Sequence, residues 1–406
     1  MSALPRSTGG AVSASLPAHG RYAVVDVIRG VSILLVILRH VQIRIPLQKT
    51  EFFQAAPVEL WRLLCTNGND GVRMFFVVSG FLITTTSLQR WGSLARLDAR
   101  RFYQLRFARI APTLGALLAV LSVLHLVGID GYVIDITRAS LPRALLAAST
   151  FHLNWLEAHR SFYLPACWDV LWSLSVEEAF YLLFPLAALV YRWPPAGHAL
   201  LLGLFAAGAW VRCALIAEPM WQSKGYLACA DALAIGCFAA IISHGRALSG
   251  AVARALLCVG GAVCLAVLVY AKAPQLRYFS DRDLHLTLLS LGTASLMVGG
   301  VRVTVGSTAA AWLRPLIACG RLSYEIYLAH GFVVLAAVSW FRARGEPPGA
   351  VYPLVGTVLA LSWCLGAAVE RWLSAPANRW LRGKAPARGV AGPPPQPLTA
   401  AESSRF

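Results

Sequence analysis

Residues 26–40 read DVIRGVSILLVILRH, an apolar run with ionisable side chains near both of its ends. Similar apolar runs of about 20 residues recur along the chain, the length at which an α-helix spans the roughly 30 Å hydrocarbon core of a bilayer. Of the 406 residues, 57% are hydrophobic and 14% are charged, whereas soluble globular domains average about 45–50% and about 25%. These features exclude a soluble, a disordered or a fibrous protein and predict an all-α integral membrane protein.

The apolar runs divide the chain into a membrane domain at 23–384 and two short tails. A run at 144–156 is too brief to span and is expected to be interfacial or re-entrant. The segments 1–22 and 385–406 are rich in small residues and proline and are expected to be disordered cytoplasmic tails. About ten transmembrane helices are predicted, at roughly 27–46, 71–89, 110–129, 175–192, 198–217, 226–243, 251–271, 284–301, 322–341 and 351–371.

The net charge of +17 comes from basic residues that gather in short segments between apolar runs. The 90–109 segment holds six arginines and one aspartate, and segments of this kind stay on the cytoplasmic side of a membrane. With both termini in the cytoplasm, 20 basic residues lie inside, 13 lie outside and three lie within spans. The distribution therefore predicts two cytoplasmic termini and argues against nucleic acid as a partner.

Ionisable side chains in the first span are costly in a bilayer, which makes them candidates for function. Arg29 and His40 are eleven residues apart, so they share one helix face about 16 Å apart along the axis. Asp26 lies on the same face and can pair with Arg29. Histidine suits proton transfer near neutral pH; an interfacial arginine and a buried, hydrogen-bonded histidine are the structural alternative. The chain lacks GxSxG, HExxH, Walker A and paired metal-ligand spacings, so no metal is expected.

Five motifs in order resemble the membrane-bound acyltransferase 3 family of bacterial O-acyltransferases, over about residues 24–380. They are the Arg29–His40 pair with ten residues between, GVRMFFVVSGFLI at 71–83, RFARIAP at 106–112, WSLSVEEAFYLLFP at 172–185 and SYEIYLAH at 323–330. Two departures stand out. Arg39 precedes the motif histidine where an apolar residue is usual, and Glu370 lies six residues before Pro376 rather than close to it.

The resemblance implies an O-acyltransferase of the bacterial inner membrane that takes its acyl group, with acetyl the leading choice, from acyl-CoA. His40 would be the general base or an acyl-imidazole relay, with Arg29 and Glu177 as catalytic partners, although Glu177 can also be a helix N-terminal acid. Arg29, Arg106 and Arg109 would bind the CoA phosphates. Candidate substrate-binding residues are Ser79, Phe81, Trp172, Tyr181 and His330; Ser79 and His330 can equally serve packing, and His330 can pair with Glu177.

The implied acceptor is a saccharide hydroxyl on a surface polysaccharide, a lipid-linked glycan or a cell-wall glycan, with a small metabolite such as a macrolide as an alternative. The predicted outer loop at 130–174 places Trp155, Trp168 and Trp172 beside acidic residues, which suits stacking on sugars or an interfacial aromatic belt. A transporter or flippase for glycolipids is the alternative from another class, but no inverted repeat is apparent. The sequence does not indicate an oligomeric state.

Overall fold

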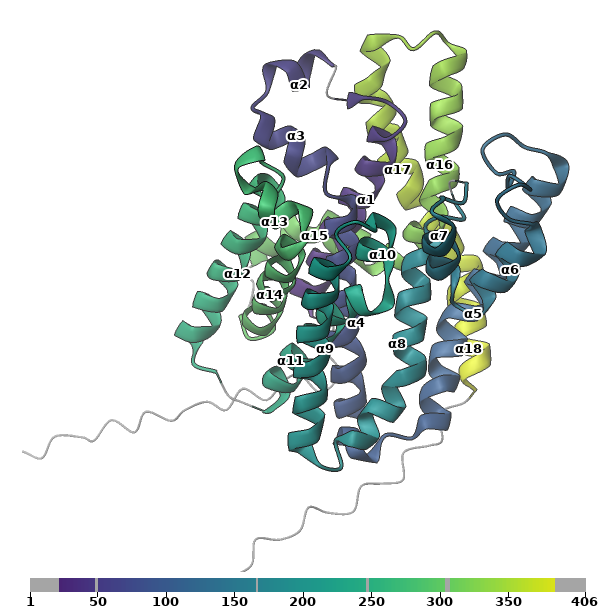
Figure 1. The fold of residues 1–406 in the computed structure, drawn as a ribbon. Helices are drawn as coiled ribbons and strands as arrows, with labels where there is room; N and C mark the ends of the chain where they lie inside the picture. Colours follow the sequence, from purple (N-terminus) through teal and green to yellow (C-terminus); the bar gives the residue numbers. More distant parts are fainter. Residues whose placement is uncertain (1–21, 48–49, 166, 246–247, 304–306, 384–406) are drawn as a thin grey trace, which may run out of the picture.

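The computed structural model describes residues 22–47, 50–165, 167–245, 248–303 and 307–383. Throughout these ranges the regular structure is helical and contains no β-strand, which confirms the predicted all-α fold (Figure 1). The predicted tail 385–406 lies outside the described residues, and so does the tail 1–22 apart from Tyr22.

Long helices run side by side to form the body of the protein (Figure 1). In the described part of the chain, eight helices are long and apolar enough to cross a bilayer. They are α4 (Gly68–Trp91), α5 (Ala99–Val127), α8 (Leu171–Val190), α9 (Pro194–Ala214), α10 with α11 (Pro219–Lys224 and Tyr226–Gly245), α12 (Gly250–Tyr270), α16 (Ser323–Ala343), and α17 with α18 (Val351–Val369 and Ala375–Arg382).

The two other predicted spans are also helical. The first is α1 (Ala23–Gln42), which carries the ionisable residues of the first apolar run, and the second is α14 (Leu284–Gly300), with 17 residues. The total of about ten spans and the cytoplasmic termini stay predictions. The run at 144–156 falls on α6 (Leu141–Ser149) and α7 (Leu153–Arg160), both too short to span.

Several shorter helices complete the fold. Of these, α15 (Ser307–Arg321) packs along α1, a helix that the sequence pattern did not predict. Two others, α2 (Glu51–Ala55) and α3 (Val58–Cys65), lie together at one end of the bundle, while α13 (Arg277–Asp281) precedes α14 (Figure 1).

The basic segment 90–109, which the hydropathy pattern places as a connection between two predicted spans, is largely helical. Helix α5 begins at Ala99, and the Asp98 side chain accepts a hydrogen bond from the backbone N–H of Arg101 at 3.0 Å. An aspartate at this position satisfies one of the free N–H groups of the first turn. Four of its six arginines, Arg100, Arg101, Arg106 and Arg109, therefore sit on a helix that enters the bundle.

The centre of the bundle is built on close contact between α4 and α11. A Cβ atom on Gly80 would lie 2.2 Å from the carbonyl oxygen of Leu233, and one on Gly236 would lie 2.1 Å from that of Val77. Only glycine allows the two backbones to approach this closely, as in other small-residue contacts between membrane helices. These glycines bring α4 into the middle of the protein, where it can present side chains to both ends of the bundle.

A buried ion cluster ties four helices together. Asp231 on α11 is fully buried and accepts hydrogen bonds from both Nη atoms of Arg212 on α9, at 2.8 and 2.7 Å. Arg73 on α4 donates to Asp231 as well, and Thr287 on α14 donates at 2.8 Å. Asp231 and Arg212 both lie within predicted spans, and the structure pairs them.

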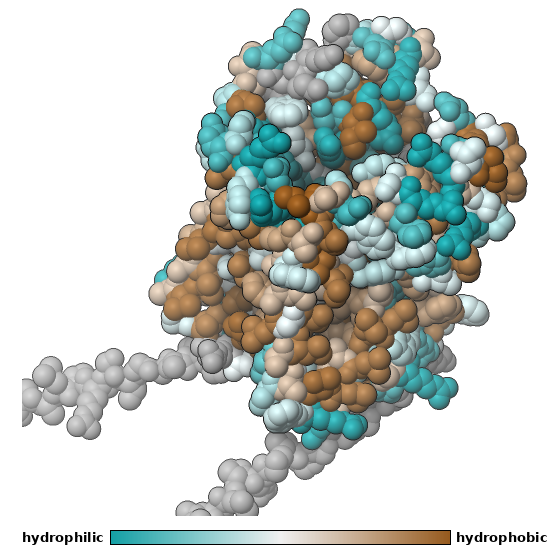
Figure 2. All heavy atoms as spheres, in the orientation of Figure 1, coloured by the Kyte–Doolittle hydropathy of each residue, from teal (hydrophilic) through white to brown (hydrophobic). Residues whose placement is uncertain are grey.

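Hydrophobic residues gather in a broad band on the face seen in Figure 2, with hydrophilic residues above the band and along its lower edge. Exposed apolar side chains from several long helices supply such a surface, among them Leu186, Trp210, Leu202 and Val259. A water-soluble protein rarely exposes apolar patches of this extent, whereas lipid chains cover them at no cost. The surface agrees with a multi-pass membrane protein.

Candidate active site

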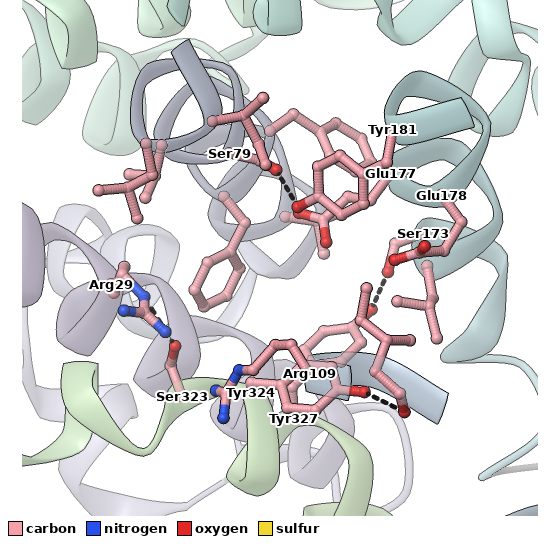
Figure 3. Close-up of a pocket in the computed structure, with 18 of the residues that line it drawn as sticks. Arg29, Ser79, Arg109, Ser173, Glu177, Glu178, Tyr181, Ser323, Tyr324 and Tyr327 are labelled. Atoms are coloured by element: carbon pink, nitrogen blue, oxygen red, sulfur yellow. Dashed lines mark hydrogen bonds between the residues drawn. The ribbon is translucent and has the colours of Figure 1, made fainter. Parts of the chain in front are cut away.

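A cavity of about 240 Å³, lined by charged and apolar side chains, lies between α1, α4, α5, α8 and α16. Figure 3 shows Arg29 of α1 on one side of this cavity and Glu177 and Tyr181 of α8 on the other. The Tyr181 hydroxyl lies 2.5 Å from Oγ of Ser79. We call this space the smaller cavity.

Arg29 is held by neighbours on both sides. Its Nε donates to Oγ of Ser323 on α16 at 3.1 Å, and its Nη1 lies 3.8 Å from Oδ1 of Asp26. The second contact confirms the predicted pairing one turn apart on α1. Since Arg29 also lines the smaller cavity, its guanidinium is oriented in advance for an anion there.

Arg106 and Arg109 both line the smaller cavity from α5, but their surroundings differ. The Arg109 guanidinium donates to the buried Glu325 at 2.8 and 3.4 Å and to Ser374 at 3.2 Å. Ser374 ends a π-helical turn, Glu370–Ser374, between α17 and α18, and such turns are frequent at functional sites. Arg106 makes no ion pair within the described ranges, and its guanidinium lies 5.9 Å from the ring centre of Tyr181. Arg106 is therefore the freer of the two for a ligand.

A second cavity, of about 770 Å³, lies toward the other end of α1 and contains His40. Its lining also includes Trp172 of α8 and Lys224 of α10. Lys224 bridges two carboxylates at 2.6 Å each, Glu157 of α7 and Asp169 of the loop before α8. Burial raises the pKa of Glu157, and the neighbouring Asp169 charge raises it further. We call this space the larger cavity.

His40 stands next to a second histidine. The rings of His40 and His330 on α16 are 5.0 Å apart and nearly perpendicular. His330 is fully buried, and its Nδ1 lies 2.7 Å from the carbonyl oxygen of Tyr327. A carbonyl can only accept, so neutral His330 carries its proton on Nδ1 and leaves Nε2 as an acceptor. Nε2 is buried and has no hydrogen-bond partner in the described structure, so it is available to a neighbouring donor.

Three side chains line both cavities and form the wall between them: Val72 and Phe76 of α4 and Tyr327 of α16. The ring of Phe76 packs edge-on against Trp172 at 6.1 Å, and the Tyr327 hydroxyl lies 2.6 Å from Oγ of Ser173. The cavities are thus separated by one layer of side chains.

The structure brings together most of the residues that the sequence singled out, but in two groups. Trp172 joins His40 in the larger cavity, whereas His330 lies against His40 and Phe81 is buried against Tyr22, so these two line neither cavity. Glu177 lies away from His40, on the Arg29 side of the wall. The smaller cavity holds Arg29, Ser79, Arg106, Arg109, Glu177 and Tyr181.

Sequence reasoning missed the charged residues around the larger cavity. Lys224 and Lys272 line it, and they are two of only four lysines in a chain with 36 basic residues. Lys272 pairs with Asp70 of α4 at 2.5 Å. The rarity of lysine is the sequence feature that could have pointed to these two residues. Glu178, next to the motif acid, also lines the smaller cavity, and its Oε1 is buried without a partner.

A family of known proteins matches most of this chain. The family model described as "Acyltransferase domain" matches residues 22–369, which include both cavities. The chain belongs to this acyltransferase family. Its membership confirms the resemblance read from the five motifs.

Two relatives show how far the similarity extends. The O-acetyltransferase OatA of Staphylococcus aureus is 24% identical over 303 residues, which cover 71% of this chain and 49% of that protein. The peptidoglycan O-acetyltransferase OatA of Listeria monocytogenes is 29% identical over 289 residues, covering 65% and 44%. The chain thus spans about half the length of these relatives. No solved structure gives a significant match.

Proposed function

We propose that this protein is a membrane O-acetyltransferase that moves an acetyl group from acetyl-CoA to a hydroxyl of a saccharide. The observation that carries the proposal is the pair of cavities with one wall in common: an arginine-lined cavity on one side and a histidine-lined cavity on the other. Relatives named as O-acetyltransferases, one of them acting on peptidoglycan, support the reaction and favour a cell-wall glycan as acceptor.

The donor fits the smaller cavity. Arginines bind phosphate oxygens through charge-assisted hydrogen bonds, and Arg29 and Arg106 face this space from two helices. CoA carries its thioester at the end of a long pantetheine arm, so its phosphates can stay at the cytoplasmic end while the acyl group reaches the wall of Val72, Phe76 and Tyr327. Under this proposal the basic start of α5 faces the cytoplasm.

The acceptor fits the larger cavity, which His40 lines next to the wall residue Tyr327 and where its ring can take a proton. The acceptor hydroxyl loses its proton to the His40 ring as its oxygen attacks the thioester carbon. The carbon–sulfur bond then breaks, and the CoA thiolate takes the proton from the His40 ring. In the alternative route the His40 nitrogen attacks the thioester carbon and the CoA thiolate leaves. The acceptor oxygen then takes the acetyl group from the ring, and the hydroxyl proton goes to the freed imidazole nitrogen or to the thiolate. In both routes His330, with Nε2 as an acceptor, can hold an N–H of His40 and fix its tautomer.

The test is acetyl transfer from labelled acetyl-CoA to peptidoglycan oligosaccharides by the protein in liposomes. General acid–base groups contribute about 10²- to 10⁴-fold, so His40→Ala should lose at least about 100-fold in rate. His244→Ala is the matched control, because His244 is an exposed histidine at the end of α11. A well-folded His40→Ala protein with near-normal transfer would remove His40 from the reaction.

The proposed sidedness has its own test. Reporters fused within 90–98, before α5 begins, should read cytoplasmic, and reporters within 130–139 should read external. The positive-inside distribution is the reason for this expectation. An external signal from 90–98 would reverse the orientation and move the donor cavity to the wrong side of the membrane for cytoplasmic acetyl-CoA.

A further inference from the structure

The larger cavity carries more positive than negative side chains. The cationic residues that line it are Arg39, Arg44, Arg73, Arg212, Lys224 and Lys272, and the acidic ones are Asp70, Asp169 and Asp283. A cavity walled by protein screens charge less well than water does, so an excess of one sign raises the local concentration of the opposite sign.

Four of the six cations already have carboxylate partners. Arg73 and Arg212 share Asp231, as described above, while Lys224 and Lys272 hold their own carboxylates at 2.6 Å or less. These carboxylates largely neutralise the four charges, and the ion pairs hold helices together. They shape the cavity without leaving it strongly positive.

The two remaining cations, Arg39 and Arg44, flank His40. Within the described residues no carboxylate lies within 4.0 Å of either guanidinium. Arg44 donates from Nη1 to the carbonyl oxygen of His40 at 2.9 Å, and the stem of Arg39 lies against Gly68 of α4. Both side chains are half-buried. Neither guanidinium forms an ion pair with a described side chain, although the Asp169 carboxylate acts on Arg44 from beyond 4.0 Å. Arg44 is held beside His40, and both guanidinium groups keep donors for a ligand.

The same cavity has a surface suited to sugar rings. Trp172 and Tyr163 line it, and Nζ of Lys224 lies 5.5 and 4.4 Å from their ring centres. Aromatic faces beside fixed polar groups bind flat, hydroxylated molecules, whereas guanidinium groups bind carboxylates and phosphates in a planar, two-pronged manner.

We infer that the acceptor is an acidic saccharide, whose carboxylate or phosphate is bound by Arg39 and Arg44 so that a hydroxyl of the same molecule meets His40. The inference rests on the proposed acetyl transfer and adds the chemical class of the acceptor. Binding through the anion orients the acceptor, so these arginines determine acceptor selection rather than the chemistry of transfer.

The test compares three acceptors that differ in one group: a neutral N-acetylglucosamine oligomer, the same oligomer with a terminal carboxylate, and the same oligomer with a terminal phosphate. The wild-type protein should have the lowest KM for one of the two acidic oligomers, and which of them it prefers distinguishes carboxylate from phosphate. Arg39→Ala should raise KM for that oligomer by about 10- to 150-fold, the effect of one charge-assisted hydrogen bond. Its kcat, its KM for acetyl-CoA and its KM for the neutral oligomer should change little.

The control is Arg138→Ala, an exposed arginine outside both cavities, which should behave as the wild type. If Arg39→Ala does not fold, the acceptor preferences of the wild-type protein and of Arg44→Gln test the inference instead.

Equal kcat/KM for neutral and acidic oligomers would overturn the inference and leave the proposed acetyl transfer standing. An effect of Arg39→Ala that depends on anionic lipid in the liposomes and not on acceptor charge would identify a lipid headgroup as the bound anion and also overturn it. No transfer to any oligomer by the wild type would reject the proposed function together with the inference.

Discussion

Replacing Asp231 by asparagine should destabilise the whole bundle. Asp231 is fully buried, and its carboxylate is the partner that Arg212 and Arg73 share. Asparagine has nearly the same shape but no charge, so the variant leaves both guanidinium groups buried without a counter-charge. Breaking a buried ion pair in this way costs about 3–5 kcal/mol, a large share of the roughly 5–15 kcal/mol that stabilises a typical protein.

Thermal unfolding in detergent can be followed with a thiol-reactive dye, since Cys229 and Cys237 on the same helix are buried and become reactive on unfolding. Asp281→Asn is the matched control: it breaks an exposed pair with Arg277 at 3.2 Å, and exposed pairs contribute about 0–1 kcal/mol. Adding Arg212→Leu to Asp231→Asn should recover part of the loss, because one unpaired charge is removed. Equal melting curves for Asp231→Asn and Asp281→Asn would refute the view that this cluster holds the helices together.

Further variants test the packing and the donor site. Gly80→Ala should destabilise the protein by about 1–3 kcal/mol through overpacking against α11, whereas Gly115→Ala on α5, with open space around it, should be neutral or slightly stabilising in the same melting assay. Arg106→Ala should weaken CoA binding by about 10- to 150-fold in calorimetry with little loss of stability. Arg109→Ala should lower the melting temperature, because it leaves the buried Glu325 carboxylate without its ion-pair partner. Unchanged CoA affinity in both Arg106→Ala and Arg106→Lys would mean that Arg106 serves only as a topology signal.

The order and nature of the long helices could be predicted from the sequence because a bilayer demands about 20 apolar residues for each span. The same is true of the shared face of Arg29 and Asp26, which depends only on helical repeat. The helical start of α5 was missed because its arginines and Asp98 look like a loop by hydropathy alone. Hydropathy carries no information on the helix cap that Asp98 provides.

The division of the site into two cavities could not be predicted. It depends on Phe76 and Tyr327, about 250 residues apart in sequence, both lying where the two cavities adjoin. The partner of His40 could not be predicted for the same reason. The packing of α16 on α1 brings His330 to His40, whereas Glu177 lines the other cavity. Motif order identifies such residues but carries no information on which of them touch.

Under the proposed orientation, the wall of Val72, Phe76 and Tyr327 also bears on how the cell keeps its membrane energised. Two cavities that open to opposite sides of a membrane and approach each other across one layer of side chains concentrate the transmembrane voltage on that layer, where each elementary charge that crosses gains or loses about 2.3 kcal/mol per 100 mV. An acetyl group is neutral, so its passage neither draws on the voltage nor is opposed by it. A proton or a sodium ion that slipped through would discharge the membrane, and the bulky apolar faces of Phe76 and Val72 stand in its path as an insulator.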